Sequence, residues 1–141
     1  MNENGDIKSA DPEQRGWAIM DISRRADKSA LPVLLSIIEG ETESNKRHVV
    51  RALGNIGGEQ SINCLLSLLS SEQGLILGEI ARALGKLNCI AALDRLEGLR
   101  NCETQWISEC CKWAIDRIKT EAQQSAPLNP HSPSAQGADG R

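Results

Sequence analysis

The sequence predicts an all-α solenoid, in which about three helix pairs stack behind a lone N-terminal helix. Apolar positions recur every 31 residues without a gap, and within each repeat they have the spacing of one helix face. Only 2% of the 141 residues are aromatic, so Leu, Ile, Val and Ala must form the core almost alone. A fixed period of this length is typical of solenoids, and an aliphatic core favours helix-on-helix packing over a β-sandwich or barrel.

The 31-residue repeat is visible both in single rows and in a longer motif. Leu31, Ile62 and Leu93 form one row of apolar residues. The letters RALG occur at residues 51–54 and again at residues 82–85. Because each unit can bury its apolar stripe only against a neighbour, units in register predict a stack with one continuous core.

The apolar spacing also predicts the individual helices. Leu31, Leu34, Leu35 and Ile38, for example, occupy positions i, i+3, i+4 and i+7, which lie on one side of a helix. We call the first helix of each pair A-type and the second B-type, and we count the lone helix as B-type. The lone helix is expected near residues 12–25, and the pairs near 28–39 with 44–56, 59–71 with 75–87, and 90–100 with 105–119.

The two ends of the chain differ in composition from the repeats. Residues 1–11 carry no apolar run, and residues 121–141 contain three of the five prolines. Such segments cannot bury enough apolar surface to offset the entropy lost on ordering. We therefore expect a disordered N-terminal arm (1–11), one folded repeat domain (12–120) and a disordered tail rich in Pro, Ser and Gly (121–141).

Two stretches of the repeats are similar to a known family. Residues 48–73 (HVVRALGNIGGEQSINCLLSLLSSEQ) and 78–99 (GEIARALGKLNCIAALDRLEGL) resemble the short HEAT-like repeats of the phycobilisome-lyase type. The resemblance covers about residues 12–119 and implies a right-handed α-α superhelix of the HEAT/armadillo type. The Asp and Pro that the family has before an A-type helix are replaced here by Gly58-Glu59 and by Cys89-Ile90. HEAT arrays serve many tasks, so the resemblance informs fold more than function.

Charge is divided unequally between the two helix types. The B-type segments hold 11 Lys and Arg against 5 Asp and Glu, whereas the A-type helices and the loops hold 3 against 9. The resemblance implies that B-type helices line the concave surface, which would then be basic. We therefore expect a non-catalytic module (an adaptor, assembly factor or regulator) that binds an acidic segment of another protein there. The expected partner-binding residues are Arg24, Arg47, Arg51, Asn55, Arg82, Lys86, Trp113 and Arg117.

Some of these residues have a second interpretation. In related repeats, the arginine before Ala-Leu-Gly often bonds an acidic residue of the neighbouring unit, so Arg51 and Arg82 are either structural or in contact with the partner. Trp17, Trp106 and Trp113 lie in the first and last B-type helices. There they either cover the open ends of the stack or anchor a partner.

The sequence shows no pattern of residues that predicts catalysis or metal binding. It has two histidines and no Cys-x-x-Cys pair, so we expect no metal, no cofactor and no enzyme activity. Cys110 is expected to face solvent because it shares its repeat position with Glu79, and Lys112 and Arg117 could activate its thiol. Because there is neither an apolar run of membrane-spanning length nor a secretory signal, we expect a cytoplasmic protein.

Two other functions remain open at this point. The relatives that give the repeat its name attach or detach bilin chromophores on phycobiliproteins, so a bilin lyase-type subunit is the first alternative, although such enzymes generally use longer arrays. Other HEAT-like proteins bind nucleic acid, but a net charge of −3 argues against this second alternative. The apolar ends of a three-unit stack would also permit weak self-association.

Overall fold

The computed structural model describes residues 6–125, and this part of the chain contains seven α-helices and no strand. The predicted all-α helical solenoid is therefore confirmed. The B-type helices are α1 (Pro12–Arg25), α3 (Glu43–Ile56), α5 (Ile76–Lys86) and α7 (Gln105–Ser125). The A-type helices are α2 (Leu31–Ile37), α4 (Glu59–Ser71) and α6 (Leu93–Leu99), and short 3-10 turns flank α2 (Lys28–Ala30, Ile38–Gly40) and precede α6 (Ile90–Ala92).

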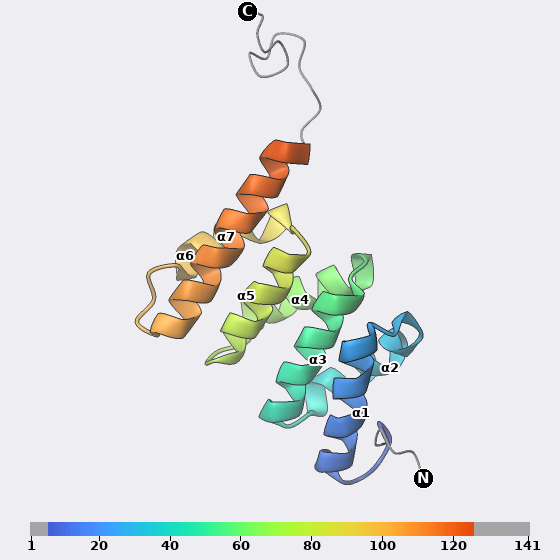
Figure 1. The fold of residues 1–141 in the computed structure, drawn as a ribbon. Coiled ribbons are helices and arrows are strands. Elements are labelled where there is room, and N and C mark those ends of the chain that lie inside the picture. The colour runs from blue at the N-terminus through green and yellow to red at the C-terminus, as the bar shows by residue number, and fades with distance from the viewer. Residues whose placement is uncertain (1–5, 126–141) are drawn as a thin grey trace, which may run out of the picture.

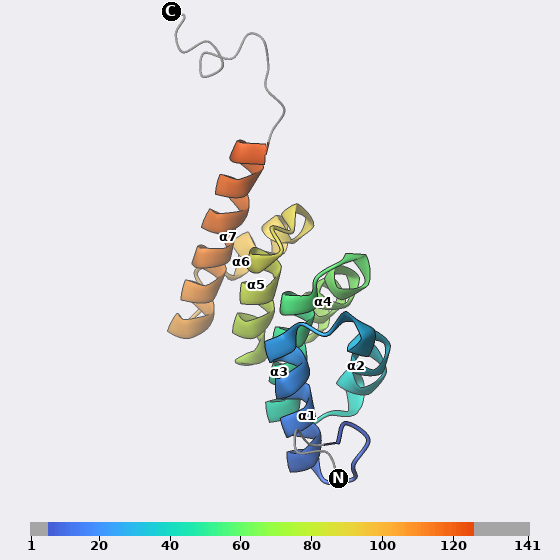
Figure 2. The ribbon, with the colours of Figure 1, turned by 45° about the vertical axis from the view of Figure 1, so that its right-hand side comes forward.

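The helices form two layers, as Figures 1 and 2 show. α1, α3, α5 and α7 pack side by side in chain order, and α2, α4 and α6 lie on one side of them. Each A-type helix packs against the B-type helix that follows it. The B-type helices therefore turn one face to the core and leave another exposed. We call this exposed side of α1, α3, α5 and α7 the B-helix face.

Aliphatic side chains fill the space between the layers. Leu34, Leu65 and Leu96 share one repeat position in the A-type helices, and all three are fully buried. Leu53 and Leu84 are buried equally well in the B-type helices. Complete burial of one such side chain contributes roughly 1.5–3 kcal/mol, so these rows are a main source of the stability of the stack.

Each of the first three B-type helices is followed by a residue with a positive φ angle. Ala26, Gly57 and Asn88 lie at one repeat position and have φ angles of 49°, 72° and 54°. In each case the residue's own N–H still bonds to the last turn, as from Gly57 to the Leu53 carbonyl at 2.8 Å, although ψ is 49° at Ala26 and −165° at Gly57. Glycine adopts a positive φ angle without strain, and asparagine does so more readily than alanine.

Close contact between neighbouring B-type helices explains the Ala-Leu-Gly motif. A Cβ atom on Gly54 would lie 2.9 Å from Ala83 Cβ, and one on Gly85 would lie 2.8 Å from Ala114 Cβ. The motif glycine of each unit thus faces, in the next unit, the residue at the alanine position of the motif. Because both residues are small, the helix backbones approach closely and hold the B-helix faces of successive units at a fixed spacing.

The first described residues are held against α1. In residues 6–11, the Asp6 N–H donates to the Gln14 carbonyl oxygen at 3.2 Å, and Arg15 Nη1 donates to the Ser9 carbonyl oxygen at 3.0 Å. The ordered chain therefore begins earlier than composition predicts, because these hydrogen bonds tie a polar segment to the helix.

The last helix continues beyond the predicted end of the repeat domain. α7 extends from residue 120 to Ser125 through Glu, Ala and Gln residues, which have good helix propensity. The predicted disorder of residues 1–5 and 126–141 stays a prediction, since these residues lie outside the described part of the chain. Between residues 6 and 125, no helix combines the length and the apolar character needed to cross a membrane.

Candidate functional site: a basic cavity on the B-helix face

Ion pairs connect the early B-type helices to the loops of the next unit. Arg15 Nε lies 2.7 Å from Glu41 Oε2, and Lys46 Nζ lies 3.2 Å from Glu72 Oε2. The two pairs occupy equivalent repeat positions. At the next equivalent position a leucine, Leu77, replaces the cation, so this series of ion pairs ends there. The cations of α1 and α3 in this row are therefore already neutralised within the fold.

Glu79 on α5 is a buried carboxylate (5% exposed) that binds two arginines of α3. Arg51 donates from Nε to Oε1 at 3.2 Å and from Nη2 to Oε2 at 3.0 Å, and Arg47 Nη2 donates to Oε2 at 3.2 Å. Burial acts to raise the pKa of Glu79, but the bonds from Arg51 and Arg47 lower this pKa more strongly, so that it lies below 4.5. Arg51 therefore has a structural role, because it bridges α3 and α5.

Arg82 occupies the repeat position of Arg51 but has different neighbours. Within residues 6–125 it forms no ion pair, because Cys110 occupies the position that corresponds to Glu79. Its guanidinium carbon instead lies 5.3 Å from the ring centroid of Trp113, and that of Arg117 lies 5.7 Å from the same centroid. Cation–π contact leaves the N–H groups at the guanidinium edges available to an anion.

The expected exposure of Cys110 is wrong. Its side chain is only 4% exposed, close to the value for Glu79 at the equivalent position. Burial raises the pKa of the Cys110 thiol above 9.0, although the charge of Arg82 acts in the opposite direction. Such a thiol has little thiolate at neutral pH, so its environment does not favour reactivity. The prediction fails because this repeat position faces the preceding B-type helix and not solvent.

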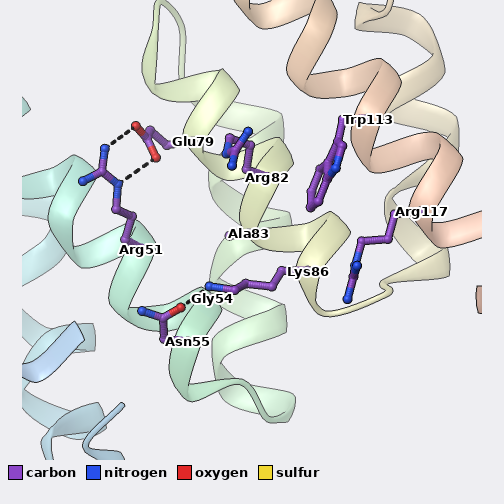
Figure 3. A pocket seen from close by; sticks show the side chains of 9 residues that line it. All are labelled: Arg51, Gly54, Asn55, Glu79, Arg82, Ala83, Lys86, Trp113 and Arg117. Atoms are coloured by element: carbon purple, nitrogen blue, oxygen red, sulfur yellow. Dashed lines mark hydrogen bonds and ion pairs between the residues drawn. The ribbon is translucent and has the colours of Figure 1, made fainter. Parts of the chain in front are cut away.

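Three cations gather around a cavity of about 350 Å³ on the B-helix face, which we call the basic cavity (Figure 3). Arg82, Lys86 and Arg117 are paired with no carboxylate of the described chain, and Lys86 donates only to the Asn55 side-chain oxygen. Trp113 lies on the α7 side of the cavity, and the Arg51–Glu79 pair lies on the other side. The complete lining consists of Arg51, Gly54, Asn55, Glu79, Arg82, Ala83, Lys86, Trp113 and Arg117.

A second cavity, of about 400 Å³, lies between α1 and α3 on the same face, and we call it the α1–α3 cavity. Trp17 and Met20 give it a large apolar surface, since they are 53% and 42% exposed. Asp21 accepts a hydrogen bond from Arg24, so the charges at its rim pair with each other. Its lining residues are Trp17, Met20, Asp21, Ser23, Arg24, His48 and Arg51.

The structure brings most of the predicted binding residues to one place. Arg51, Asn55, Arg82, Lys86, Trp113 and Arg117 all line the basic cavity. Arg24 lines the α1–α3 cavity, and Arg47 lines neither of these two cavities. Sequence reasoning did not identify Glu79 as the partner of Arg51. The sequence does contain a signal for this contact, because Glu79 is the only acidic residue in the α5 segment.

The two tryptophans of α7 pack against α5, on the side of α7 that faces the preceding unit. A Cβ atom on Gly78 would lie 2.1 Å from Trp106 Cζ3, and one on Gly85 would lie 2.9 Å from Trp113 Cζ3. Each ring therefore sits over a glycine of the preceding B-type helix. These contacts do not fit the interpretation that the rings cover the open end of the stack. Trp113, which is 41% exposed, also presents part of its ring to the basic cavity.

The chemistry of the basic cavity is suited to holding an anion. Its lining offers guanidinium and ammonium donors beside an indole surface. Its one carboxylate, Glu79, is already bonded to Arg47 and Arg51. Among the side chains of residues 6–125, no group of three or more His, Cys, Asp or Glu is placed to hold a metal ion.

Comparison with known proteins identifies the family of the fold. A family model of HEAT repeats matches residues 6–76 and also residues 34–115, so the two matches together extend from the first turn into α7. This match concerns HEAT repeats in general and does not single out the phycobilisome-lyase type. A search of curated proteins found no match. HEAT repeats generally mediate protein–protein interactions and are typically non-catalytic. Because the match covers most of the sequence and the structure is an all-α stack of helix pairs, this chain belongs to the HEAT-repeat family.

Proposed function

We propose that this protein is a non-catalytic interaction module and that its basic cavity binds an acidic segment of another protein. The observation that carries this proposal is the convergence of Arg82, Lys86 and Arg117 on one cavity with no carboxylate of the described chain to pair with them. Most other cations of the B-type helices pair with acidic residues, so these three are the charges that a partner would meet.

The geometry of the cavity favours carboxylates over a diffuse negative charge. Arg82 and Arg117 both lie against the Trp113 ring, so their planar groups lose less freedom when an anion binds. A guanidinium edge can donate two parallel hydrogen bonds to one carboxylate. The ring of Trp113 adds apolar surface that the methylene groups of a Glu side chain can cover.

Charge reversal at Arg82 tests the proposal without disturbing the Arg51–Glu79 pair. The probe is a short fluorescein-labelled oligo-glutamate peptide, and oligo-glutamine is its neutral counterpart. We expect Arg82→Glu to weaken oligo-glutamate binding by more than about tenfold, equivalent to about 1.4 kcal/mol, measured by fluorescence anisotropy at low salt. Lys112→Glu is the matched control, because it makes the same change in charge on the exposed side of α7 but lines neither cavity.

Three results would contradict the proposal. Equal losses in Arg82→Glu and Lys112→Glu would indicate attraction by the general charge of the protein. Equal binding of oligo-glutamate and oligo-glutamine would remove the role of charge. A bilin also carries carboxylates, so free bilin is tested as a separate ligand. A shifted visible absorption band that disappears in Arg82→Glu would indicate a chromophore site instead.

A further inference from the structure

We infer that the partner segment has two parts, and that an apolar side chain about four residues from its acidic part occupies the α1–α3 cavity. This inference rests on the proposed function of the basic cavity and specifies the partner more narrowly. It follows from the different chemistry of the two cavities, from the lining residue that they share and from the distance between them.

The α1–α3 cavity differs from the basic cavity because its lining arginines already pair with carboxylates. Asp21 pairs with Arg24, and its other oxygen lies 3.5 Å from Arg25 Nη1. Arg51, which also lines this cavity, is paired with Glu79. Arginines that are already paired attract a further carboxylate less strongly, so a purely acidic segment would leave the α1–α3 cavity unused.

The α1–α3 cavity carries exposed apolar surface. Trp17 and Met20 belong to the few large apolar side chains of the described chain that are more than a third exposed. Burial and the charges of Arg51 and Arg47 lower the pKa of the neighbouring His48 imidazole, which favours its uncharged form. Exposed apolar surface within a cavity is typical of a site for an aliphatic or aromatic side chain.

The two cavities are adjacent on the B-helix face, because they share one lining residue. Arg51 lines both, and its bonds to Glu79 hold its side chain in place between them. One partner segment that crosses α1, α3, α5 and α7 would therefore pass over both cavities in turn. The B-helix face thus offers a site for an apolar side chain at the α1 end and a site for an anion at the α7 end.

The helix spacing sets the separation of the two parts. The lining of the basic cavity centres on α5, whereas the second cavity lies between α1 and α3. The centres of the two cavities are therefore about one and a half helix spacings apart, or roughly 12–15 Å, because packed helices lie about 8–10 Å apart. An extended peptide advances about 3.3 Å per residue, so the two side chains should be about four residues apart. An even separation also places them on the same side of the extended segment.

A set of peptides tests the inference with the full chain. The reference peptide has a Glu cluster and a Leu four residues away. Two companions replace that Leu by Ser or move it next to the cluster. We expect the reference peptide to bind about tenfold more tightly than either companion. Met20→Gln should remove most of this gain, while Ile90→Gln, which changes an exposed side chain outside both cavities, should leave it intact.

The outcomes separate this inference from the proposed function. If all three peptides bind with equal affinity and Arg82→Glu weakens them all, the basic cavity stands and the two-part segment is wrong. If the gain from Leu persists in Met20→Gln and in Trp17→Gln, the apolar side chain binds elsewhere and the inference is again wrong. If none of the peptides binds the native protein, the proposed function itself fails.

Discussion

Arg51 on α3 and Arg82 on α5 occupy the same position of consecutive repeats, but only Arg51 has a carboxylate to bind. Glu79 lies across the α3–α5 contact from Arg51, whereas Cys110 takes the equivalent position across the α5–α7 contact from Arg82. The backbone arrangement is the same at both contacts, with a glycine of one helix against an alanine of the next. A single residue type therefore decides whether the arginine joins two units or remains available to a partner.

The same difference recurs in a second row of the stack. Arg15–Glu41 and Lys46–Glu72 are equivalent ion pairs, and the next pair would join Leu77 and Glu103, where no cation is present. Ion pairs thus hold the first units together, while the last contact relies on packing of small and aromatic side chains. For this reason, the unpaired positive charge of the B-type helices lies mainly near α5 and α7.

Among the substitutions that probe these two contacts, Glu79→Gln should reduce stability most. It removes the charge that Arg51 and Arg47 share while keeping the shape of the side chain. Loss of one member of a buried pair costs about 3–5 kcal/mol, but both arginines reach solvent, so we expect a loss of about 1–2 kcal/mol. Urea unfolding followed by circular dichroism measures it. Glu109→Gln, at an exposed site of α7, is the control and should change stability by less than about 0.5 kcal/mol.

The pH dependence of the same pair gives an independent check. The pKa of Glu79 is lower in the folded chain than its ordinary value of 4.5, so the carboxylate adds stability above pH 4.5. This contribution is lost as the pH falls below 4.5 and through the folded-state pKa. The stability difference between native protein and Glu79→Gln should therefore be full at pH 7 and should shrink below pH 4.5. A difference that stays constant down to pH 3 would show that charge is not its cause.

Cys110→Glu makes the last contact resemble the central one. The new carboxylate would take the position that Glu79 has in the preceding unit and would pair with Arg82. We expect oligo-glutamate binding to fall by about tenfold, equivalent to about 1.4 kcal/mol, while the melting curve shows that the domain stays folded. Cys110→Gln has nearly the same size without charge and should retain more of the binding. Equal losses in both variants would mean that the buried position, and not the freed arginine, determines the result.

The fold is more predictable than the site, for a physical reason. α4 occupies Glu59–Ser71, as its apolar spacing predicts, because the buried stripe of a helix is written directly into the sequence. The 31-residue rows also place Arg82 and Arg117 on one surface, since equivalent positions stack on adjacent helices. The neighbours of an individual side chain are not given by period alone. Sequence reasoning places Glu79 and Cys110 in solvent because a charged residue is usually exposed, yet a carboxylate that receives several hydrogen bonds can be buried.

The smallest effect, and the most direct test of the comparison, is the difference between Arg51→Ala and Arg82→Ala. Arg51→Ala removes two hydrogen bonds to a buried carboxylate and should lower the free energy of unfolding by about 1 kcal/mol. Arg82→Ala removes a cation–π contact at an exposed site and should cost only about 0.5 kcal/mol. Urea unfolding monitored by circular dichroism measures both.

The order should reverse for binding, because Arg82 pairs with no carboxylate of the described chain while the N–H groups of Arg51 are largely committed to Glu79. Arg82→Ala should therefore weaken oligo-glutamate binding more than Arg51→Ala does. If Arg82→Ala were the more destabilising change and also reduced binding less than Arg51→Ala, the two arginines would have the opposite roles. The charge excess of the basic cavity would then have to come from Lys86 and Arg117 alone.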